Sequence, residues 1–479
     1  MNSIGKNFLY NAAYQILLIL LPLITTPYIS RILGADGIGT YSYTYTIANY
    51  FMLLAMLGVK NYGNRSIAAV REDRLRLSST FWQIYGLQFW CALAALVLYF
   101  GYVLLFEREY TLIALVQGIY VLAGLLDISW FFFGMEEFKI TVLRNIAIRL
   151  INLVCIFLLV RTREDLWKYT LIMTLGALVS QGYLWFYLRR FVDWCRPKVR
   201  EMARHMRAEL LLFIPVIAVS LYKMMDKVML GQMSAITQVG YYESVEKIIN
   251  IPLGVITALG TVMLPRMSNL VAKGKRKESR QYIYHSMLFA VFLASAMCFG
   301  MIGIARDLVP IFLGDAYLPC IPLLQAMAPT VLFIAWANVI RTQYLIPNKM
   351  DWSYIVSVMI GAGVNLVING LLIPRLDAMG AVIGTICAEG SVCLCQTIMV
   401  RKQLEIKRYV RDTFPLFLVG FAMLILIEII SQLTDNPAVL LLEIAAGGIF
   451  YVLAAALYLI VLKPPYIAEI IQRVKRRKE

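Results

Sequence analysis

The chain has 479 residues, of which 60% are hydrophobic and only 15% are charged, and its formal net charge is +16. Soluble globular proteins are nearer half apolar and a quarter charged, so this composition excludes an ordinary soluble domain. Apolar runs of about 20 residues recur from end to end, each long enough to cross ~30 Å of hydrocarbon as an α-helix. The runs are continuous rather than alternating, which also excludes an outer-membrane barrel.

The apolar runs predict an all-α polytopic membrane protein with fourteen transmembrane helices. The first run is too long for the apolar part of a cleavable signal peptide, so we expect it to remain as the first span. The expected ranges are 8–30, 40–59, 80–105, 111–133, 140–160, 168–188, 209–230, 248–270, 286–305, 318–346, 352–373, 380–400, 412–432 and 438–462.

Basic residues alternate between successive connections. Of the 45 Lys and Arg residues, 32 lie in the termini and the even-numbered connections, and eight lie in the odd-numbered ones. The positive-inside rule therefore predicts that both termini are cytoplasmic. Because topology accounts for the basic loops, nucleic acid is not an expected partner.

Two segments of the chain resemble each other at an offset of 201 residues. The matching positions are Gly39, Tyr41, Ile47 and Asn49 in the first segment, and Gly240, Tyr242, Ile248 and Asn250 in the second. The offset spans six helices, so both copies keep one orientation, as in parallel repeats about an axis along the membrane normal. We expect two six-helix lobes, 1–206 and 207–405, and then two further helices with a basic cytoplasmic tail in 406–479.

The second repeated segment carries several ionisable residues within or next to its apolar runs. Ionisable groups at the centre of a membrane helix cost at least ~2.5–3.5 kcal/mol each, so they usually face a protein interior or a wet cavity. The functional interpretation is a cavity wall that meets an anionic head group or carries a coupling cation. The alternative is that Asp226, Glu243 and Lys247 neutralise one another near the interface. The candidate cavity residues here are Lys223, Asp226, Lys227, Glu246, Lys247 and Asn250.

Two other spans carry polar residues at helical spacing. In the fifth span, Arg149 is too deep to reach the interface easily and is expected to face the cavity, whereas Arg144 lies nearer the cytoplasmic end and can snorkel. In the second span, Asn49 shares a face with Ser42 and Thr46. These groups either line the cavity or form hydrogen bonds between helices.

Isolated acids at membrane depth are candidates for ion coupling. Asp127 in the fourth span and Glu389 in the twelfth could each take up a proton, because burial disfavours an ionised carboxyl. Asp127 could instead pair with Arg149, which would make it structural. Enzyme signatures and a Walker A segment are absent. We expect no cofactor and no metal, and an energy source such as coupling to H⁺ or Na⁺.

Four stretches, SRILGADGIGTYSY, SLYKMMDKVMLG, VGYYESVEKIINIP and TVMLPRMSNL, resemble the polysaccharide transporter branch of the MOP superfamily. The likeness is greatest to Wzx-type flippases of capsular repeat units. It implies a two-lobed, MATE-like fold with a cationic central cavity that alternates its access across the bacterial cytoplasmic membrane. It also implies that the cargo is an oligosaccharide on undecaprenyl diphosphate, moved from the inner to the outer leaflet.

The resemblance extends to site residues and partners. Arg31, which closes the first span on the outer side, lies in a matching stretch, as do the candidates of the seventh and eighth spans. The implied partners are the lipid-linked oligosaccharide, membrane lipid, and a polysaccharide polymerase with its chain-length machinery.

Two other functions stay open from the sequence. A cation-coupled multidrug exporter of the same fold would favour an acid-dominated aromatic pocket, whereas here Lys and Arg accompany the acids. A membrane polysaccharide polymerase would need a large outer loop to hold catalytic residues, and the connections are short.

Overall fold

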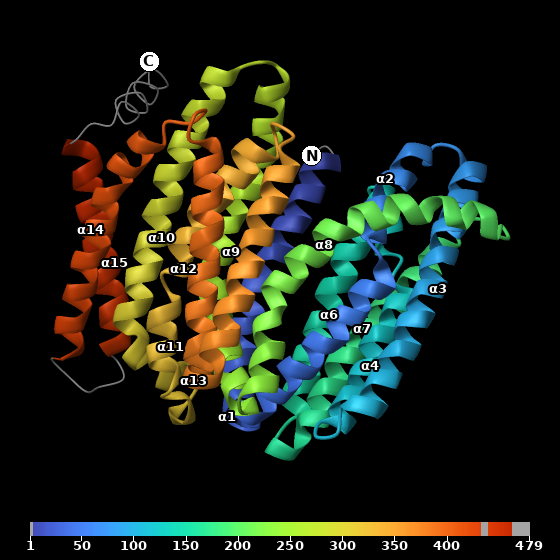
Figure 1. Ribbon diagram of the computed structural model, residues 1–479, viewed down its shortest axis with the longest axis horizontal. Helices are drawn as coiled ribbons and strands as arrows, with labels where there is room; N and C mark the ends of the chain where they lie inside the picture. Colours follow the sequence, from blue (N-terminus) through green and yellow to red (C-terminus); the bar gives the residue numbers. More distant parts are fainter. Residues whose placement is uncertain (1–2, 433–438, 462–479) are drawn as a thin grey trace. The chain divides into compact units, whose positions relative to one another are not determined.

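The computed structural model describes residues 3–432 and 439–461, and the regular elements of these ranges are helices (Figure 1). Ten of the described helical segments are long and apolar enough to cross a membrane, which confirms a multi-pass helical membrane protein. The chain divides into two compact units, Met1–Glu243 and Ser244–Glu479. This division falls inside helix α9, later than the lobe boundary expected at residue 206. The basic tail expected at the C-terminus lies outside the described residues.

The N-terminal unit contains eight α-helices and the beginning of a ninth. A short 3₁₀ turn, η1 (Arg163–Asp165), leads into α7. The α-helices are α1 (Ser3–Met56), α2 (Val59–Val70), α3 (Arg74–Phe106), α4 (Thr111–Leu126), α5 (Ser129–Gly134), α6 (Phe138–Leu159), α7 (Leu166–Leu188), α8 (Val199–Met233) and the first residues of α9 (Ile236–Ala272).

Helix α1 covers the first two expected spans and is interrupted between them. The interruption is at Gly34, where φ is 68° and ψ is 179°. Glycine adopts this backbone conformation readily because it has no Cβ. Pro22 and Pro27 lie within the first part of the helix. A single glycine, rather than a loop, therefore joins the first span to the second.

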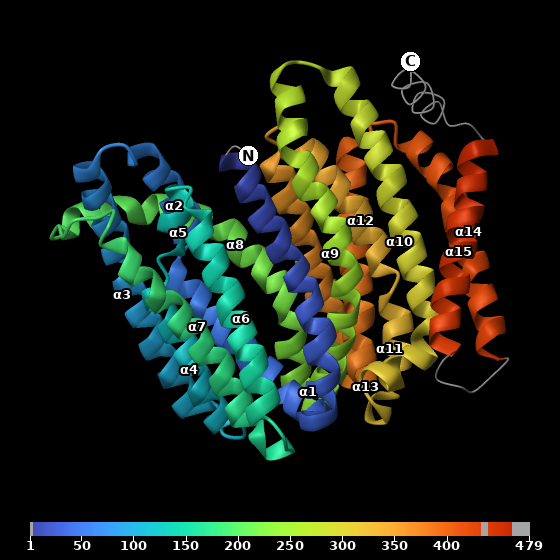
Figure 2. The same ribbon diagram turned by 180° about the vertical axis from the view of Figure 1, so that it is seen from behind.

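The N-terminal unit packs around α4, which contacts α1, α3 and α7. Figure 2 shows α3, α4, α6 and α7 of this unit from behind. An aromatic core lies where α3 meets the short helix α5, and it includes the fully buried rings of Phe81, Trp130, Phe131 and Phe132. This core holds the interrupted fourth span, α4 and α5, against its neighbours.

The longest basic connection, which joins α7 to α8, packs on the N-terminal unit through polar contacts. Arg74 binds both carboxylate oxygens of Asp193 at 2.7 Å, and the indole of Trp82 donates to the Asp193 carbonyl at 2.9 Å. The guanidinium lowers the pKa of Asp193 by hydrogen bonding to its charged form. Further along, His205 contacts the Tyr62 hydroxyl at 2.6 Å, and burial lowers the pKa of this imidazole. The connection is thus an ordered part of the unit.

The C-terminal unit continues from α9 and is built around α10 (Arg276–Phe312). Helix α10 packs against α11, α12, α14 and α15. The remaining elements are η2 (Asp315–Tyr317), α11 (Cys320–Met327), α12 (Thr330–Ile340), the π-helical turn η3 (Arg341–Leu345), α13 (Asp351–Val400), α14 (Ile406–Ser431) and α15 (Val439–Val461).

Helix α13 covers two expected spans, the eleventh and the twelfth. It is divided at Asp377, whose φ of 50° is unusual for a residue other than glycine. Pro374 stands three residues earlier and removes a backbone donor from the same stretch. The chain therefore changes direction here without leaving helical structure on either side.

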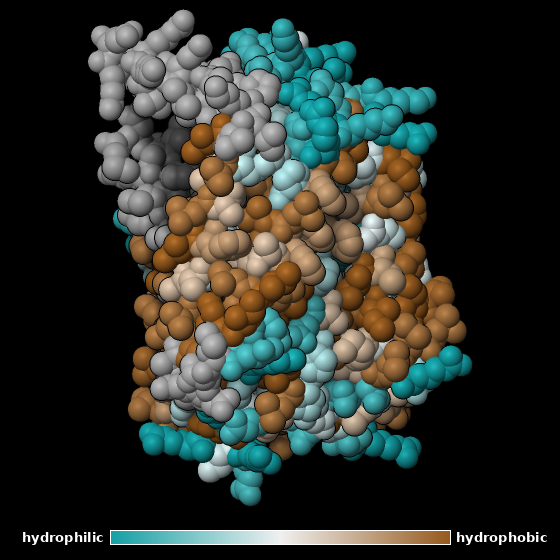
Figure 3. All heavy atoms as spheres, turned by 90° about the vertical axis from the view of Figure 1, so that its left-hand side faces the viewer, coloured by the Kyte–Doolittle hydropathy of each residue, from teal (hydrophilic) through white to brown (hydrophobic). Residues whose placement is uncertain are grey.

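The helices α10, α14 and α15 enclose an apolar core of their own. It includes Phe299, Met423, Ile427 and Tyr451, each under 10% exposed. On the face that carries α14 and α15, hydrophobic side chains form a broad band between hydrophilic groups at both ends (Figure 3). This distribution is that of a helix pair surrounded by hydrocarbon.

Two glycines of α10, three residues apart, test how closely this core is packed. A β-carbon at Gly303 would lie 2.9 Å from Cγ2 of Ile427, whereas at Gly300 its nearest neighbour would be the Met423 methyl at 3.7 Å. We expect Gly303→Ala to destabilise the protein by about 1–3 kcal/mol through overpacking. Gly300→Ala should be neutral or stabilising by roughly 0.5–1 kcal/mol through helix propensity. Thermal unfolding in detergent measures both, and equal midpoints for the two variants would contradict this packing.

Candidate functional site

Residues 35–42 of the first repeated segment lie beside residues 236–243 of the second, and both stretches belong to the N-terminal unit. The hydroxyl of Thr237 donates to the carboxylate of Asp36, and Ser42 Oγ donates to Glu243 Oε2 at 2.8 Å. Between these two contacts, a β-carbon on Gly39 would collide with the backbone of Ile236, and one on Gly240 would collide with that of Ala35. The second part of α1 and the first turns of α9 are therefore in direct backbone contact.

The residues that meet here are equivalent in the repeat. Asp36 and Thr237, Gly39 and Gly240, and Ser42 and Glu243 are each 201 residues apart, the offset found in the sequence. Contact between equivalent positions is what a twofold axis running between two segments produces. The internal match at this offset therefore has a physical counterpart in the contact between its equivalent positions. Glycine stands at the crossing point because only it leaves room for the other backbone.

Substitution at this crossing should disturb the contact between the two segments. In Gly240→Ala the new methyl has only backbone atoms to displace, so we expect a loss of about 1–3 kcal/mol or a failure to accumulate in the membrane. The matched control is Gly101→Ala in α3, where a β-carbon would meet no atom within 4 Å. Membrane abundance and the midpoint of thermal unfolding measure the effect. A Gly240→Ala protein as stable as the control would refute the close approach.

Charged residues expected in the cavity wall form two contacts beside this crossing. Lys227 Nζ lies 2.5 Å from Glu243 Oε2, and both side chains are largely buried, at 13% and 14% exposure. Asp226, which is 4% exposed, accepts a hydrogen bond from the Tyr242 hydroxyl at 2.7 Å. The neutralisation considered from the sequence is therefore found for Glu243, but its partner is Lys227. Lys223, on the same helix, is exposed.

Asn49 is placed among tyrosines. Its carbonyl oxygen accepts from the Tyr120 hydroxyl at 3.1 Å, and its amide nitrogen lies 3.0 Å from Met224 Sδ of α8. The rings of Tyr45 and Tyr120 are in contact at 5.1 Å, and Tyr41 stacks on Tyr45 at 5.8 Å. Asn49 therefore joins the second span to the fourth and the seventh by polar contacts, beside a set of amphipathic aromatic rings.

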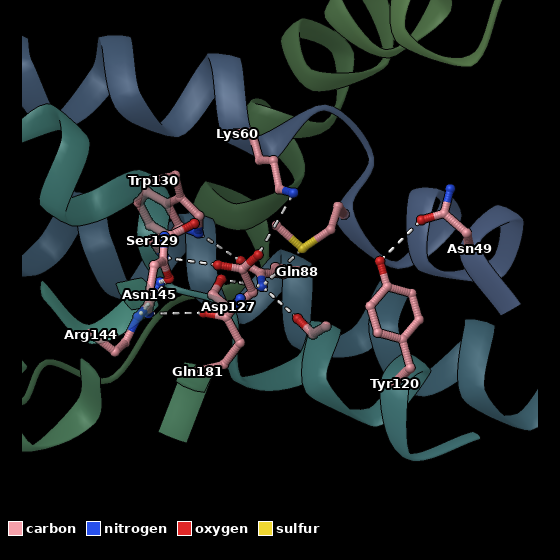
Figure 4. A network of polar contacts seen from close by, with 12 residues as sticks. Asn49, Lys60, Gln88, Tyr120, Asp127, Ser129, Trp130, Arg144, Asn145 and Gln181 are labelled. Atoms are coloured by element: carbon pink, nitrogen blue, oxygen red, sulfur yellow. Dashed lines mark hydrogen bonds and ion pairs between the residues drawn. The ribbon is translucent and has the colours of Figure 1, made fainter. Parts of the chain in front are cut away.

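A second polar network surrounds Asp127 at the break between α4 and α5 (Figure 4). Asp127 Oδ1 accepts from the backbone of Ser129 at 2.9 Å, and its Oδ2 lies 3.9 Å from Lys60 Nζ. Gln88 donates to the Asp127 carbonyl at 2.8 Å and accepts from the Trp130 indole at 2.9 Å. The sequence suggested Arg149 as an ionic partner for this acid, and the structure gives it Lys60. These contacts satisfy backbone groups that the helix break would otherwise leave unpaired.

In the fifth span the buried arginine is Arg144, whereas Arg149 is exposed. Arg144 is 7% exposed and donates to the Ser180 carbonyl at 3.0 Å and to Gln181 Oε1 at 3.3 Å, both on α7 (Figure 4). The expectation that Arg144 extends to the interface is therefore wrong. The signal that could have found it is Gln181, a side-chain acceptor in the neighbouring span, whereas the Ser180 acceptor is a backbone carbonyl that the sequence does not mark.

The other expected site residues are divided between the two units. Arg31 belongs to the N-terminal unit and is exposed. Glu246, Lys247 and Glu389 of the C-terminal unit are half-buried, and Asn250 is exposed. A common cavity for all of them remains a prediction. Within the described ranges, no three His, Cys, Asp or Glu side chains are arranged to hold a metal ion.

Ten apolar helical segments and an interrupted first helix pair define a polytopic helical membrane protein. Comparison of its sequence with protein families gives a more specific assignment. The family described as "Polysaccharide biosynthesis protein" matches residues 4–271. The chain belongs to this family, which agrees with the resemblance to polysaccharide transporters found in its sequence.

Relatives and solved structures agree with this assignment. A "Putative O-antigen transporter" of Escherichia coli (strain K12) is 25% identical over 83% of this chain and 96% of its own length. A protein of the same description from Shigella dysenteriae is 24% identical over 78% of this chain and 94% of its own. Among solved structures, the lipid II flippase MurJ in an inward closed conformation has a TM-score of 0.79 at 13% identity, covering 95% of this chain and 99% of MurJ.

A multidrug resistance MATE family transporter of the MOP superfamily is also similar in structure. Its inward-facing conformation gives a TM-score of 0.59 at 12% identity, over 82% of this chain and 99% of its own. At such identities the likeness to MurJ and to this transporter shows the fold alone, which is MATE-like.

Proposed function

We propose that this protein is a flippase that moves undecaprenyl-diphosphate-linked oligosaccharide repeat units from the inner to the outer leaflet of the bacterial cytoplasmic membrane. The units would serve synthesis of a polysaccharide such as a capsule, an exopolysaccharide or an O-antigen-like chain. The observation that carries the proposal is the family match together with relatives described as O-antigen transporters, aligned over most of the chain. On this view the protein is a transporter and not an enzyme.

The proposed topology has fourteen spans with both termini in the cytoplasm. The two helix interruptions support it, because division of α1 at Gly34 and of α13 at Asp377 turns two long helices into four spans. The charged helix α8 supplies another. We further propose lobes of six helices each, 1–206 and 207–405, with α14 and α15 as an addition. The contact between equivalent residues of the repeat supports a twofold relation between these lobes.

The proposed cargo has two chemical needs that the candidate site matches. A diphosphate is anionic and cannot cross hydrocarbon unaided, and each sugar hydroxyl needs a polar partner. Lys227 could exchange Glu243 for a phosphate, with Arg31, Arg149 and Lys223 as further cations. Tyrosine hydroxyls and Asn49 offer partners for the glycan. We propose that these groups line one cavity, opened alternately to either side, and that H⁺ or Na⁺ coupling at Asp127 or Glu389 drives the cycle.

The alternative is a cation-coupled multidrug exporter, which the MATE-like fold also allows. The charge at the site disfavours the exporter, because the acids are accompanied by lysines. Lys227 pairs with Glu243, and the same helix also carries Lys223. A polysaccharide polymerase is disfavoured by the short connections between helices, such as that from Phe106 to Thr111.

Cargo can be tested in cells that lack their own repeat-unit flippase. We expect expression of this chain to restore polysaccharide at the surface, because lipid-linked repeat units again reach the outer leaflet. The measurement is leaflet-resolved analysis of the lipid-linked intermediates, with drug susceptibility as a parallel readout. An unchanged outer-leaflet pool across a panel of strains, together with raised drug resistance, would favour the exporter and overturn the flippase.

The ion pair of Lys227 and Glu243 separates a transport role from a structural one. Lys227→Met alone leaves a buried carboxylate without its cation, which should cost about 3–5 kcal/mol and lower membrane abundance. Adding Glu243→Gln should restore abundance, because the uncompensated charge is gone. If Lys227 binds cargo, the double variant remains deficient in transport by tenfold or more. A double variant that regains full transport would show that the lysine only neutralises Glu243.

A further inference from the structure

Three carboxylic acids lie together in the C-terminal unit, on helices that carry none of the residues assigned to transport above. Asp307 lies near the end of α10, Glu428 near the end of α14 and Glu443 near the beginning of α15. These helices pack against one another, with Ser431 of α14 beside them. On the face that carries α14 and α15, a hydrophilic patch interrupts the hydrophobic band (Figure 3). In the proposed topology, this is the outer end of the unit.

Glu443 is the unusual member of this cluster. Its side chain is 0% exposed, and neither of its carboxylate oxygens has a hydrogen-bond partner among the described residues. The groups that face it are the carboxyl of Asp307 and the hydroxyl of Ser431. That hydroxyl donates to Asp307 Oδ2 at 3.2 Å. Glu443 thus points at another acid whose nearest donor is already engaged.

The cation of the cluster does not relieve this arrangement. Arg306 Nη1 donates to Glu428 Oε1 at 2.8 Å, in an ion pair whose side chains are 58% and 35% exposed. Arg306 is therefore engaged at the surface, while Asp307 and Glu443 face each other beneath it. Two adjacent carboxylates, one of them fully buried and without a donor, are unfavourable when both are ionised, because repulsion and desolvation add to each other. A single proton removes one charge and supplies the hydrogen-bond donor that Glu443 lacks.

We propose that Asp307 and Glu443 form a proton-binding site that holds one shared proton and joins α15 to α10. The hydroxyl of Ser431 binds Asp307 Oδ2 and so orients this carboxyl group. The other oxygen of Asp307 is left to share a proton with Glu443. Below this joint, α15 is held by apolar contacts and by the Tyr451 hydroxyl, which donates to the Phe292 carbonyl at 2.8 Å. Loss of the proton places two negative charges across the α10–α15 interface, so docking of this end of α15 depends on pH. The inference does not depend on the identity of the cargo.

Infrared spectroscopy tests occupancy directly on the purified full-length protein. We expect the wild type near neutral pH to show the carbonyl stretch of a protonated carboxylic acid, which shifts in D₂O. Glu443→Gln and Asp307→Asn should each lower its intensity, because each removes one half of the pair while keeping its shape. The matched control is Glu278→Gln on the same helix α10, an exposed acid paired with Lys275, which should leave the intensity unchanged. An intensity that is unchanged in both variants of the pair would overturn the proposal.

Thermal unfolding provides a second measurement that does not rely on band assignment. A proton bound more tightly in the folded protein contributes stability that is present at low pH and is lost as the pH rises. The unfolding temperature of the wild type should therefore decrease as the pH is raised from about 6 to about 9. In Glu443→Gln this decrease should be smaller by half or more. Glu278→Gln should follow the wild type. An unchanged slope in both Glu443→Gln and Asp307→Asn would contradict a shared proton. A midpoint raised by Na⁺ but not by choline at fixed pH would identify a metal cation instead, and would likewise overturn it.

Discussion

The approach of two backbones at Gly39 and Gly240 is the contact on which the candidate site depends. It brings the second part of α1 against the first turns of α9 without side chains between them. On either side of the glycines, residues that are equivalent in the repeat become partners, so that Ser42 reaches Glu243. That contact in turn positions Glu243 for the ion pair with Lys227. Helices joined through glycine can pack without a hydrophobic driving force, which hydrocarbon does not supply.

Polar groups within the spans follow one constraint: each must find a partner inside the protein, because lipid offers none. The break between α4 and α5 shows how the chain meets it. Gln88 donates to the backbone carbonyls of Gly124 and Asp127 and accepts from the Trp130 indole. The Asp127 carboxylate accepts from the backbone amide of Ser129 at the start of the following turn. In the fifth span, the same need brings Arg144 to the carbonyl of Ser180. Membrane depth alone therefore does not mark a residue as functional.

The sequence was sufficient to predict a multi-pass helical membrane protein and much less so for the site. Continuous apolar runs locate membrane helices reliably, and the described helices follow them. The repeat also proved informative, since its glycines meet. Hydropathy could not show that one residue, Gly34 or Asp377, joins two spans without a loop. Nor could it show which of Arg144 and Arg149 is buried, because that depends on acceptors from another helix. Pairing across helices is long-range information that a single sequence does not display.

Asp127 and Glu389 were proposed as sites of ion coupling because they lie at membrane depth. The hydrogen-bond partners of a buried acid provide a stricter criterion. Asp127 accepts a hydrogen bond from the backbone amide of Ser129, so its carboxylate has a donor within the protein. Asp226 and Glu243 likewise have hydroxyl donors. Two deeply buried acids, Glu209 and Glu443, have no hydrogen-bond partner within the described part of the chain. A buried carboxyl without donors is held in its neutral form, since nothing offsets the loss of water. Groups of this kind can exchange a proton as their surroundings change. Neither Glu209 nor Glu443 lies between Lys223 and Lys247, the segment whose charges mark the second copy of the repeat.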